Sequence, residues 1–223
     1  LNKELNEDLS TLNEKSIILP LGEVKISRNV KSILIIVRMN TDVEIWDQSK
    51  KRLFELPKIE YSYRSINSLI NSINFCQNKY PKLKIKTIIV DDNSSDKNLD
   101  RIKKLIDGKN INIISLNYDK YKSFIKKQKN KETFSNLASL MNSFEIGKNQ
   151  GEDLIFFIED DYLHFKPMLE EMVASYERIA SQLKKDLFMC PSDYPYLYMS
   201  NQKTNLLIGN KRHWRTINKT LCT

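Results

Sequence analysis

Asp153-Leu-Ile-Phe-Phe-Ile-Glu-Asp-Asp-Tyr162 is the stretch that decides the fold of this 223-residue chain. Apolar residues from Leu154 to Ile158 run directly into three carboxylates, Glu159, Asp160 and Asp161. A short run rich in Ile and Phe favours a strand buried on both faces, as in a parallel sheet covered by helices. The carboxylates would then lie at the carboxyl end of the strand, where open α/β sheets bind ligands. Strand alternation predicts that Glu159 and Asp161 point to one side and Asp160 to the other.

Three adjacent acids repel one another, by about 1 kcal/mol for a pair ~4 Å apart in water and about 4 kcal/mol at an effective dielectric of 20. Such a cluster is therefore either well solvated or neutralised by a cation. Mg²⁺ and Mn²⁺ prefer carboxylate oxygens, and Mg²⁺ usually takes one or two carboxylates together with substrate phosphates. The structural alternative is a solvated acidic turn that caps the next helix, since acids are stabilising at helix N-termini.

Further apolar runs predict the rest of a sheet. We expect strands at 32–37, 85–90 and 111–116, and a short fifth strand at 187–190. Apolar residues at helical spacing predict helices at 63–80, from about 96 to Gly108, at 133–147 and at 168–183. A short amphipathic helix is also expected within residues 1–14. The alternating order predicts an α/β fold with a mainly parallel central sheet and helices on both faces.

Polar residues follow two of the other strands. Asp91 and Asp92 come directly after the second strand, and Arg38 and Asn40 follow the first. Because the carboxyl ends of parallel strands meet at one edge, we expect Asp91, Asp92 and Asp161 to lie on a common rim. Two acidic strand ends are harder to explain as solvated turns than one.

The charge of the chain is positive overall and unevenly distributed. The formal net charge is +8 and the pI about 9.2, which favours anionic partners such as nucleotide phosphates or acidic lipid headgroups. A lysine-rich segment spans residues 120–131 and contains two aromatic residues, too few for a base-stacking surface. We expect a solvated surface loop there, and nucleic acid is not an expected partner.

Cysteine and histidine show no metal-ligand spacing. Cys76, Cys190 and Cys222 are far apart without a CxxC pair, which is typical of a reducing compartment. No apolar run approaches the ~18 residues of a membrane span. We expect a cytoplasmic protein, with peripheral contact at the inner membrane face as the other expectation.

The two acidic segments resemble a known family. Lys86-Thr-Ile-Ile-Val-Asp-Asp-Asn-Ser-Ser-Asp96 is similar to the VDDxSxD segment of GT-A glycosyltransferases, in particular the family 2 type. Phe157-Ile-Glu-Asp-Asp-Tyr162 resembles the DXD motif of that fold, with Glu159 in place of the first Asp. The resemblance covers about residues 31–195. It implies an N-terminal extension over 1–30 and the start of a truncated acceptor-side region over 196–223.

The resemblance implies a nucleotide-sugar donor, with a UDP-sugar as the first candidate. An acid of the Asp91–Asp92 pair would contact the nucleoside, with Arg38 and Asn40 beside it. Asp161, together with Glu159, would hold Mn²⁺ or Mg²⁺ against the diphosphate, and Asp160 would lie near the ribose. A divalent ion would stabilise the charge that develops on the departing phosphates.

The resemblance further implies an acceptor and a general base. The acceptor hydroxyl of a glycan, lipid-linked or protein acceptor needs a base, which an inverting enzyme places across the sugar from the leaving group. In this family the base follows the fifth strand, where Asp193 is the last carboxylate of the chain. His213 is a weaker candidate, and His213 and Trp214 would lie on the acceptor side.

Two other classes remain open at this point. One is a non-catalytic module that binds sugar nucleotides, and the other is a Mg²⁺-dependent nucleic-acid enzyme that would use the +8 charge. A dinucleotide dehydrogenase is disfavoured because no GxGxxG follows any predicted strand. A receiver domain is disfavoured because its acidic pair would follow the first strand.

Overall fold

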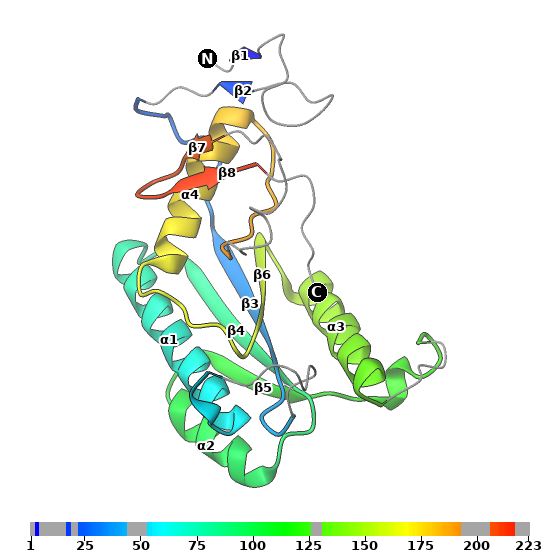
Figure 1. The fold of residues 1–223 in the computed structure, drawn as a ribbon. Coiled ribbons are helices and arrows are strands. Elements are labelled where there is room, and N and C mark those ends of the chain that lie inside the picture. Colours follow the sequence, from blue (N-terminus) through cyan, green and yellow to red (C-terminus); the bar gives the residue numbers. More distant parts are fainter. Residues whose placement is uncertain are drawn as a thin grey trace. The chain divides into compact units, whose positions relative to one another are not determined.

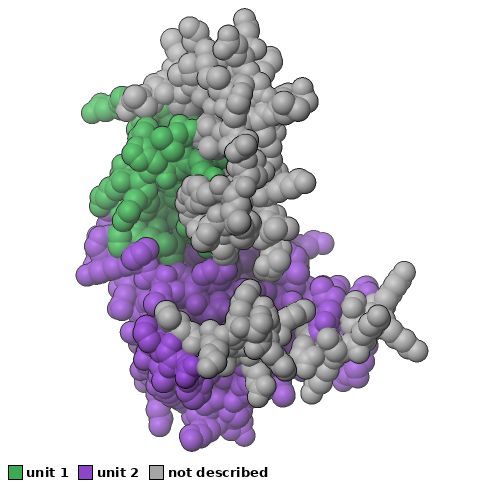
Figure 2. Space-filling model, viewed as in Figure 1, with its two compact units in different colours: residues 1–30, 167–223 green, residues 31–166 purple. Residues whose placement is uncertain are grey.

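The computed structural model describes residues 3–4, 17–18, 22–43, 53–125, 131–192 and 206–216. The chain divides into two compact units, which Figure 2 shows in different colours. The larger unit is Lys31–Lys166, and the other combines Leu1–Val30 with Pro167–Thr223. The functional assignment of the three predicted segments, 1–30, 31–195 and 196–223, stays a prediction.

A four-stranded parallel sheet forms the centre of the larger unit (Figure 1). Its strands are β3 (Ser32–Met39), β4 (Lys84–Asp91), β5 (Ile111–Ser115) and β6 (Leu154–Glu159), in the order β5-β4-β3-β6. All three neighbouring pairs are parallel. β3 lies inside the sheet and is buried almost throughout, as its uninterrupted apolar sequence requires. The predicted α/β class and the predicted parallel sheet are confirmed.

The strand order contains a reversal that matters for ligand binding. Successive strands β3, β4 and β5 are added outward in one direction, and β6 then returns to the other side of β3. The reversal therefore lies between β3 and β6, where Arg38 is in register with Glu159. Open α/β sheets bind ligands in the crevice outside the carboxyl ends of the strands at such a switch point.

Helices cover both faces of this sheet (Figure 1). On one face, α3 (Lys131–Gln150) packs through Ala138 and Ile146 against Ile36 and Val90. α1 (Lys58–Lys79) and α2 (Asp96–Ile106) lie on the opposite side. Short 3₁₀ turns occupy η1 (Leu53–Glu55) and η2 (Asp119–Tyr121). Gly108 follows α2 with φ of 68°, the left-handed conformation that glycine adopts without strain.

Three sequence predictions need correction. Leu187–Cys190 is not a strand, and Phe188 in its middle is fully exposed, so no buried sheet position holds this segment. Lys3–Glu4 forms a short strand, β1, antiparallel to β2 (Ile17–Ile18), so a helix through these two residues is wrong. α1 begins at Lys58 rather than at Tyr63. Pro57 directly precedes this first helical residue, and at that position the N–H that proline lacks would make no intrahelical hydrogen bond.

The other unit is organised around α4 (Met168–Leu183), whose bounds agree with the predicted helix. Beside it, β7 (Leu206–Ile208) and β8 (His213–Arg215) form an antiparallel hairpin. The Glu171 carboxylate accepts backbone N–H groups of Asn210, Lys211 and Arg212 at 2.8–3.1 Å, so the hairpin turn is tied to α4. None of the helices in the described residues is long and apolar enough to cross a membrane.

Candidate functional site

Three chain segments bring polar side chains to the carboxyl edge of the sheet. The register places Met39 beside Asp91 and Arg38 beside Glu159, so the ends of β3, β4 and β6 are adjacent. We call the polar residues at these three ends the carboxyl rim. Its members are Arg38, Asn40, Asp91, Asp92, Glu159, Asp160 and Asp161. The structure therefore confirms that the two acidic clusters share one edge of the sheet.

Arg38 is turned toward the acidic triplet. Its Nη2 donates to Glu159 Oε1, and its Nη1 donates to Asn136 Oδ1 at 2.8 Å, on α3. The Arg38 side chain is 12% exposed and that of Glu159 is 35% exposed. Glu159 therefore lies on the α3 side of the sheet with a guanidinium against it.

Asp160 points the other way, toward α1, and is buried. Lys58 Nζ donates to its Oδ1 at 2.8 Å, and Ser62 Oγ donates to its Oδ2 at 2.5 Å. The backbone N–H of Asn40 lies 3.4 Å from the same Oδ2. Burial raises the pKa of Asp160, while the Lys58 charge and the hydrogen bonds from Lys58 and Ser62 act to lower it. Asp160 is thus a buried structural group, held by a lysine whose side chain is itself 10% exposed.

Asp161 is the exposed acid of the triplet, and its direction differs from the alternation prediction. The strand ends at Glu159 and the chain turns at Asp160 and Asp161, so alternation no longer applies. The Asp161 carboxylate is 54% exposed and its Oδ2 lies 3.8 Å from Lys58 Nζ. Asp161 shares a cation with Asp160 rather than facing the same side as Glu159.

The β4 end carries two acids in different environments. The Asp92 carboxylate accepts hydrogen bonds from Tyr118 Oη and Ser135 Oγ. Burial, followed by the hydrogen bond to Asp92, raises the pKa of Tyr118 to about 12, so the phenol stays a donor at neutral pH.

Asp91 is more deeply buried, at 2% exposure. Its Oδ2 accepts the Ser94 N–H at 3.3 Å, and its Oδ1 is buried with no hydrogen-bond partner among the described residues. Burial raises the pKa of Asp91, and the charges of Asp92 and Asp42 act in the same direction against the Ser94 hydrogen bonds. Asp91 is therefore the most deeply buried acid at the end of β4.

The resemblance implies a divalent cation at the acidic triplet, but two of its three carboxylates already have close hydrogen-bond partners. Glu159 is paired with Arg38, and both Asp160 oxygens are taken by Lys58 and Ser62. In the part of the chain that the structure describes, no group of three or more His, Cys, Asp or Glu side chains could hold a metal ion. The residues as arranged do not fit a preformed Mn²⁺ or Mg²⁺ site, and ligation by Glu159 and Asp161 stays a prediction.

The predicted acceptor-side residues belong to the other unit. Asp193 lies outside the described residues. His213 is exposed on β8, and Trp214 is half-buried, with its ring close to the Gly209 backbone, where an added Cβ would lie 2.6 Å from the indole. The roles of these three residues stay predictions.

Sequence reasoning missed several side chains that shape the rim. Lys58 and Ser62 are one helical turn apart on α1, yet nothing in the sequence links that helix start to β6. Tyr118, directly before η2, and Ser135, on α3, likewise reach Asp92, and nothing in the sequence links either residue to the end of β4. Asp42 was overlooked as a helix cap: it accepts the Ser95 N–H at 2.6 Å ahead of α2.

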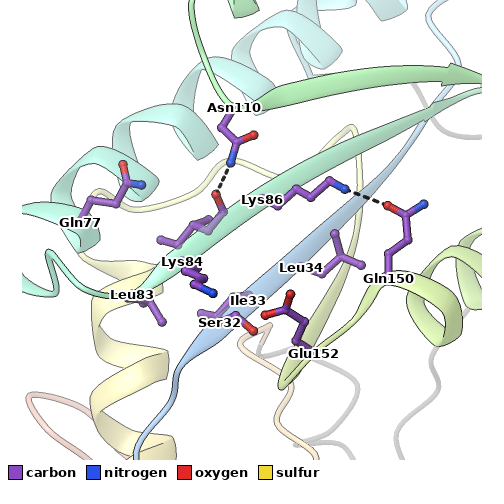
Figure 3. A pocket seen from close by; sticks show the side chains of 11 residues that line it. Ser32, Ile33, Leu34, Gln77, Leu83, Lys84, Lys86, Asn110, Gln150 and Glu152 are labelled. Carbon is purple, nitrogen blue, oxygen red and sulfur yellow. Dashed lines mark hydrogen bonds between the residues drawn. The ribbon is translucent and has the colours of Figure 1, made fainter.

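A polar pocket lies at the opposite, amino end of the strands (Figure 3). Its volume is about 410 Å³, and it is open to solvent. Lys86 Nζ donates to Gln150 Oε1 at 2.9 Å, and Asn110 Nδ2 donates to the Ile85 carbonyl at 2.8 Å. Its lining carries no acidic cluster comparable to the rim, with Glu152 the one carboxylate there.

No protein-family model matches the sequence, and no curated protein matches it.

Proposed function

We propose that this protein is a glycosyltransferase that binds a nucleotide-diphosphate sugar at the carboxyl rim and moves the sugar to an acceptor hydroxyl. The observation that carries the proposal is the meeting of two acidic strand ends with Arg38 at the switch point between β3 and β6. The similarity of the VDDNSSD segment to family 2 GT-A enzymes supports the same reading.

In this proposal, different residues of the carboxyl rim bind different parts of the nucleotide-sugar donor. Asp91 Oδ1, which has no hydrogen-bond partner among the described residues, accepts an N–H or O–H of the nucleoside. Asp92, held by Tyr118 and Ser135, lines the same place with a fixed orientation. Arg38 and Asn40 contribute a cation and an amide beside the phosphates and ribose.

The transfer step forms one bond to the anomeric carbon of the sugar and breaks another. The acceptor hydroxyl gives its proton to a base, its oxygen bonds to the anomeric carbon, and the bond from that carbon to the diphosphate oxygen breaks. The electron pair of that bond leaves on the nucleoside diphosphate. Asp193 is the proposed base and His213 and Trp214 the proposed acceptor contacts, with a glycan, lipid-linked or protein acceptor. No step is assigned to a metal ion, because the rim acids do not fit a preformed site.

A thermal-shift panel tests the proposal. UDP-, GDP-, TDP- and CMP-sugars are added to the whole chain, each in EDTA and in Mn²⁺. A ligand at about 100 times its Kd stabilises the folded state by about 2.7 kcal/mol, which raises Tm by about 5–11 °C for a protein of this size. We expect one nucleotide base to stabilise, and Asp92→Asn to remove the shift while Asp100→Asn, an exposed α2 acid, keeps it.

Three other results would change the assignment. Stabilisation without hydrolysis or transfer of the sugar would favour a non-catalytic binding module. Salt-dependent binding to DNA or RNA in place of nucleotide sugars would favour a nucleic-acid enzyme. No stabilisation by any nucleotide would remove the proposal.

A further inference from the structure

We infer that Lys58 is a built-in cation of the rim, which occupies the place of a divalent metal ion and makes nucleotide-diphosphate binding independent of metal. The inference rests on the proposed function for its ligand, a nucleoside diphosphate. Its structural part, the exclusion of a divalent ion by Lys58, stands on the contacts of the acidic triplet alone.

Lys58 sits where a metal ion would have to sit. It is the first residue of α1, and its Nζ lies 2.8 Å from Asp160 Oδ1 and 3.8 Å from Asp161 Oδ2. One ammonium thus faces Asp160 and Asp161, the two acids that directly follow β6. A divalent ion bound to this pair would have to displace the ammonium from them.

Displacement is disfavoured by burial. The Lys58 side chain is 10% exposed and the Asp160 side chain 7% exposed. A buried pair that loses one partner leaves an uncompensated charge out of water, which is among the most destabilising changes in a protein. Ser62 holds the second oxygen of Asp160, so the carboxylate cannot rotate to a metal without giving up a further hydrogen bond.

The charges of the triplet are largely balanced without a metal. Glu159, Asp160 and Asp161 carry three negative charges, and Arg38 and Lys58 carry two positive charges against them, which leaves one negative charge. Arg38 acts from the α3 side and Lys58 from the α1 side. Two fixed cations therefore flank the end of β6, and the electrostatic reason to recruit Mn²⁺ or Mg²⁺ is mostly removed.

The ammonium keeps donors for an anion. A lysine has three N–H donors. In the described structure Asp160 takes one of them, and Asp161 at 3.8 Å is beyond direct hydrogen-bond distance. A phosphate oxygen at the rim can accept another, so that Lys58 would stabilise the negative charge that develops on the leaving diphosphate. Asp160 and Ser62 then act as positioning residues that hold the ammonium.

The first experiment uses Mn²⁺ alone as the probe, by electron paramagnetic resonance titration. We expect wild type to show no specific Mn²⁺ site, and Lys58→Gln to gain one because its two acids are released. Lys58→Arg, which keeps the charge, should gain none. Lys79→Gln is the matched control, since it removes the same charge at the far end of the same helix, about 30 Å away. A Mn²⁺ site in wild type that Asp161→Asn abolishes would overturn the inference.

The second experiment needs no variant and remains decisive where Lys58→Gln does not fold. Calorimetric titration of wild type with UDP and GDP is run in EDTA and in Mn²⁺. We expect the Kd of the preferred nucleotide to agree between the two conditions. A Kd weaker in EDTA by tenfold or more, about 1.4 kcal/mol, would overturn the inference.

The two experiments separate failure of the inference from failure of the proposed function. Absence of nucleotide binding in both buffers contradicts the proposed function. The Mn²⁺ titrations of wild type, Lys58→Gln and Lys58→Arg still decide whether Lys58 excludes the metal.

Discussion

Asp160 and Lys58 form the most buried ion pair described at the rim, and its integrity is expected to dominate local stability. Asp160→Ala leaves the Lys58 ammonium buried without its partner, and breaking such a pair costs about 3–5 kcal/mol. Urea denaturation measures the loss. Asp161→Ala is the control: this acid is 54% exposed, and exposed ion pairs contribute about 0–1 kcal/mol. Equal losses in the two variants would show that Lys58 is not held by Asp160.

His164 makes stability depend on pH. Burial lowers its pKa from 6.5 to about 4, and its Nε2 has no hydrogen-bond partner among the described residues. The unfolded chain therefore binds the proton first, so stability is fully present above pH 6.5 and falls as the pH drops toward 4. From pH 7 to pH 5 the loss from this group is about 2 kcal/mol.

His164→Gln removes this titration, and urea denaturation at pH 7 and pH 5 checks it. The variant should lose less stability than wild type over this interval. His213→Gln, which changes an exposed histidine, should behave as wild type. An unchanged pH dependence in His164→Gln would contradict a neutral, buried His164.

At the scale of elements, α2 depends on a cap from outside its own sequence. Asp42 follows β3, and its carboxylate accepts the Ser95 N–H at 2.6 Å and the Asn98 Nδ2 donor at 2.8 Å. The N-cap residue Ser95 makes no side-chain capping bond of its own. Asp42→Ala should therefore cost about 1–2 kcal/mol, as measured for lost helix caps.

The comparison for this cap is Asp100→Ala. Asp100 is exposed on α2 and pairs with Lys103 at 3.3 Å. Its loss should change the free energy of unfolding by less than about 0.5 kcal/mol. Equal effects of Asp42→Ala and Asp100→Ala would mean that the β3 end does not cap α2.

The elements of the larger unit could largely be predicted because their strands are runs of consecutive apolar residues. The apolar runs of β3 and β4 leave few alternatives to a buried parallel strand in a chain of this order. β6 is parallel as predicted, but its burial on both faces is wrong: it ends the described strand order, and Ile155 and Phe157 are each 40% exposed. Leu187–Cys190 has a similar composition, but no neighbouring strand pairs with it in the described residues. Pairing is a property of the fold and cannot be read from four residues. The start of α1 was hidden by Pro57, since proline marks both loops and first helical turns.

At the rim, the sequence could predict the acids but not their counter-charges. Acids that follow a buried strand are recognisable by position. The partner of Asp160 is Lys58, which precedes the helix predicted at 63–80 and carries no sign of its target in the sequence. Arg38 was predicted to lie at the rim, and its pairing with Glu159 follows from the register of β3 with β6, which the sequence alone does not fix.

At the scale of the whole molecule, we propose that the unit Lys31–Lys166 binds the nucleotide-sugar donor. Trp214 belongs to the other unit, so Trp214→Ala should leave the Kd for UDP unchanged while it weakens use of the acceptor. Calorimetric titration and a transfer assay measure the two effects. Because Trp214 packs close to Gly209, thermal melting of the variant identifies any loss of the hairpin. Loss of UDP binding in a folded variant would contradict the assignment.

We propose that the nucleotide binds at the carboxyl rim and not in the pocket at the amino ends of the strands. Amide chemical-shift mapping of the isotope-labelled chain, titrated with UDP or with the nucleotide that the thermal-shift panel selects, tests this directly. We expect the largest shifts at 38–42, 91–95 and 159–162. Shifts concentrated at Ser32–Leu34, Lys84–Lys86, Asn110 and Gln150, the residues that line the pocket of Figure 3, would contradict it.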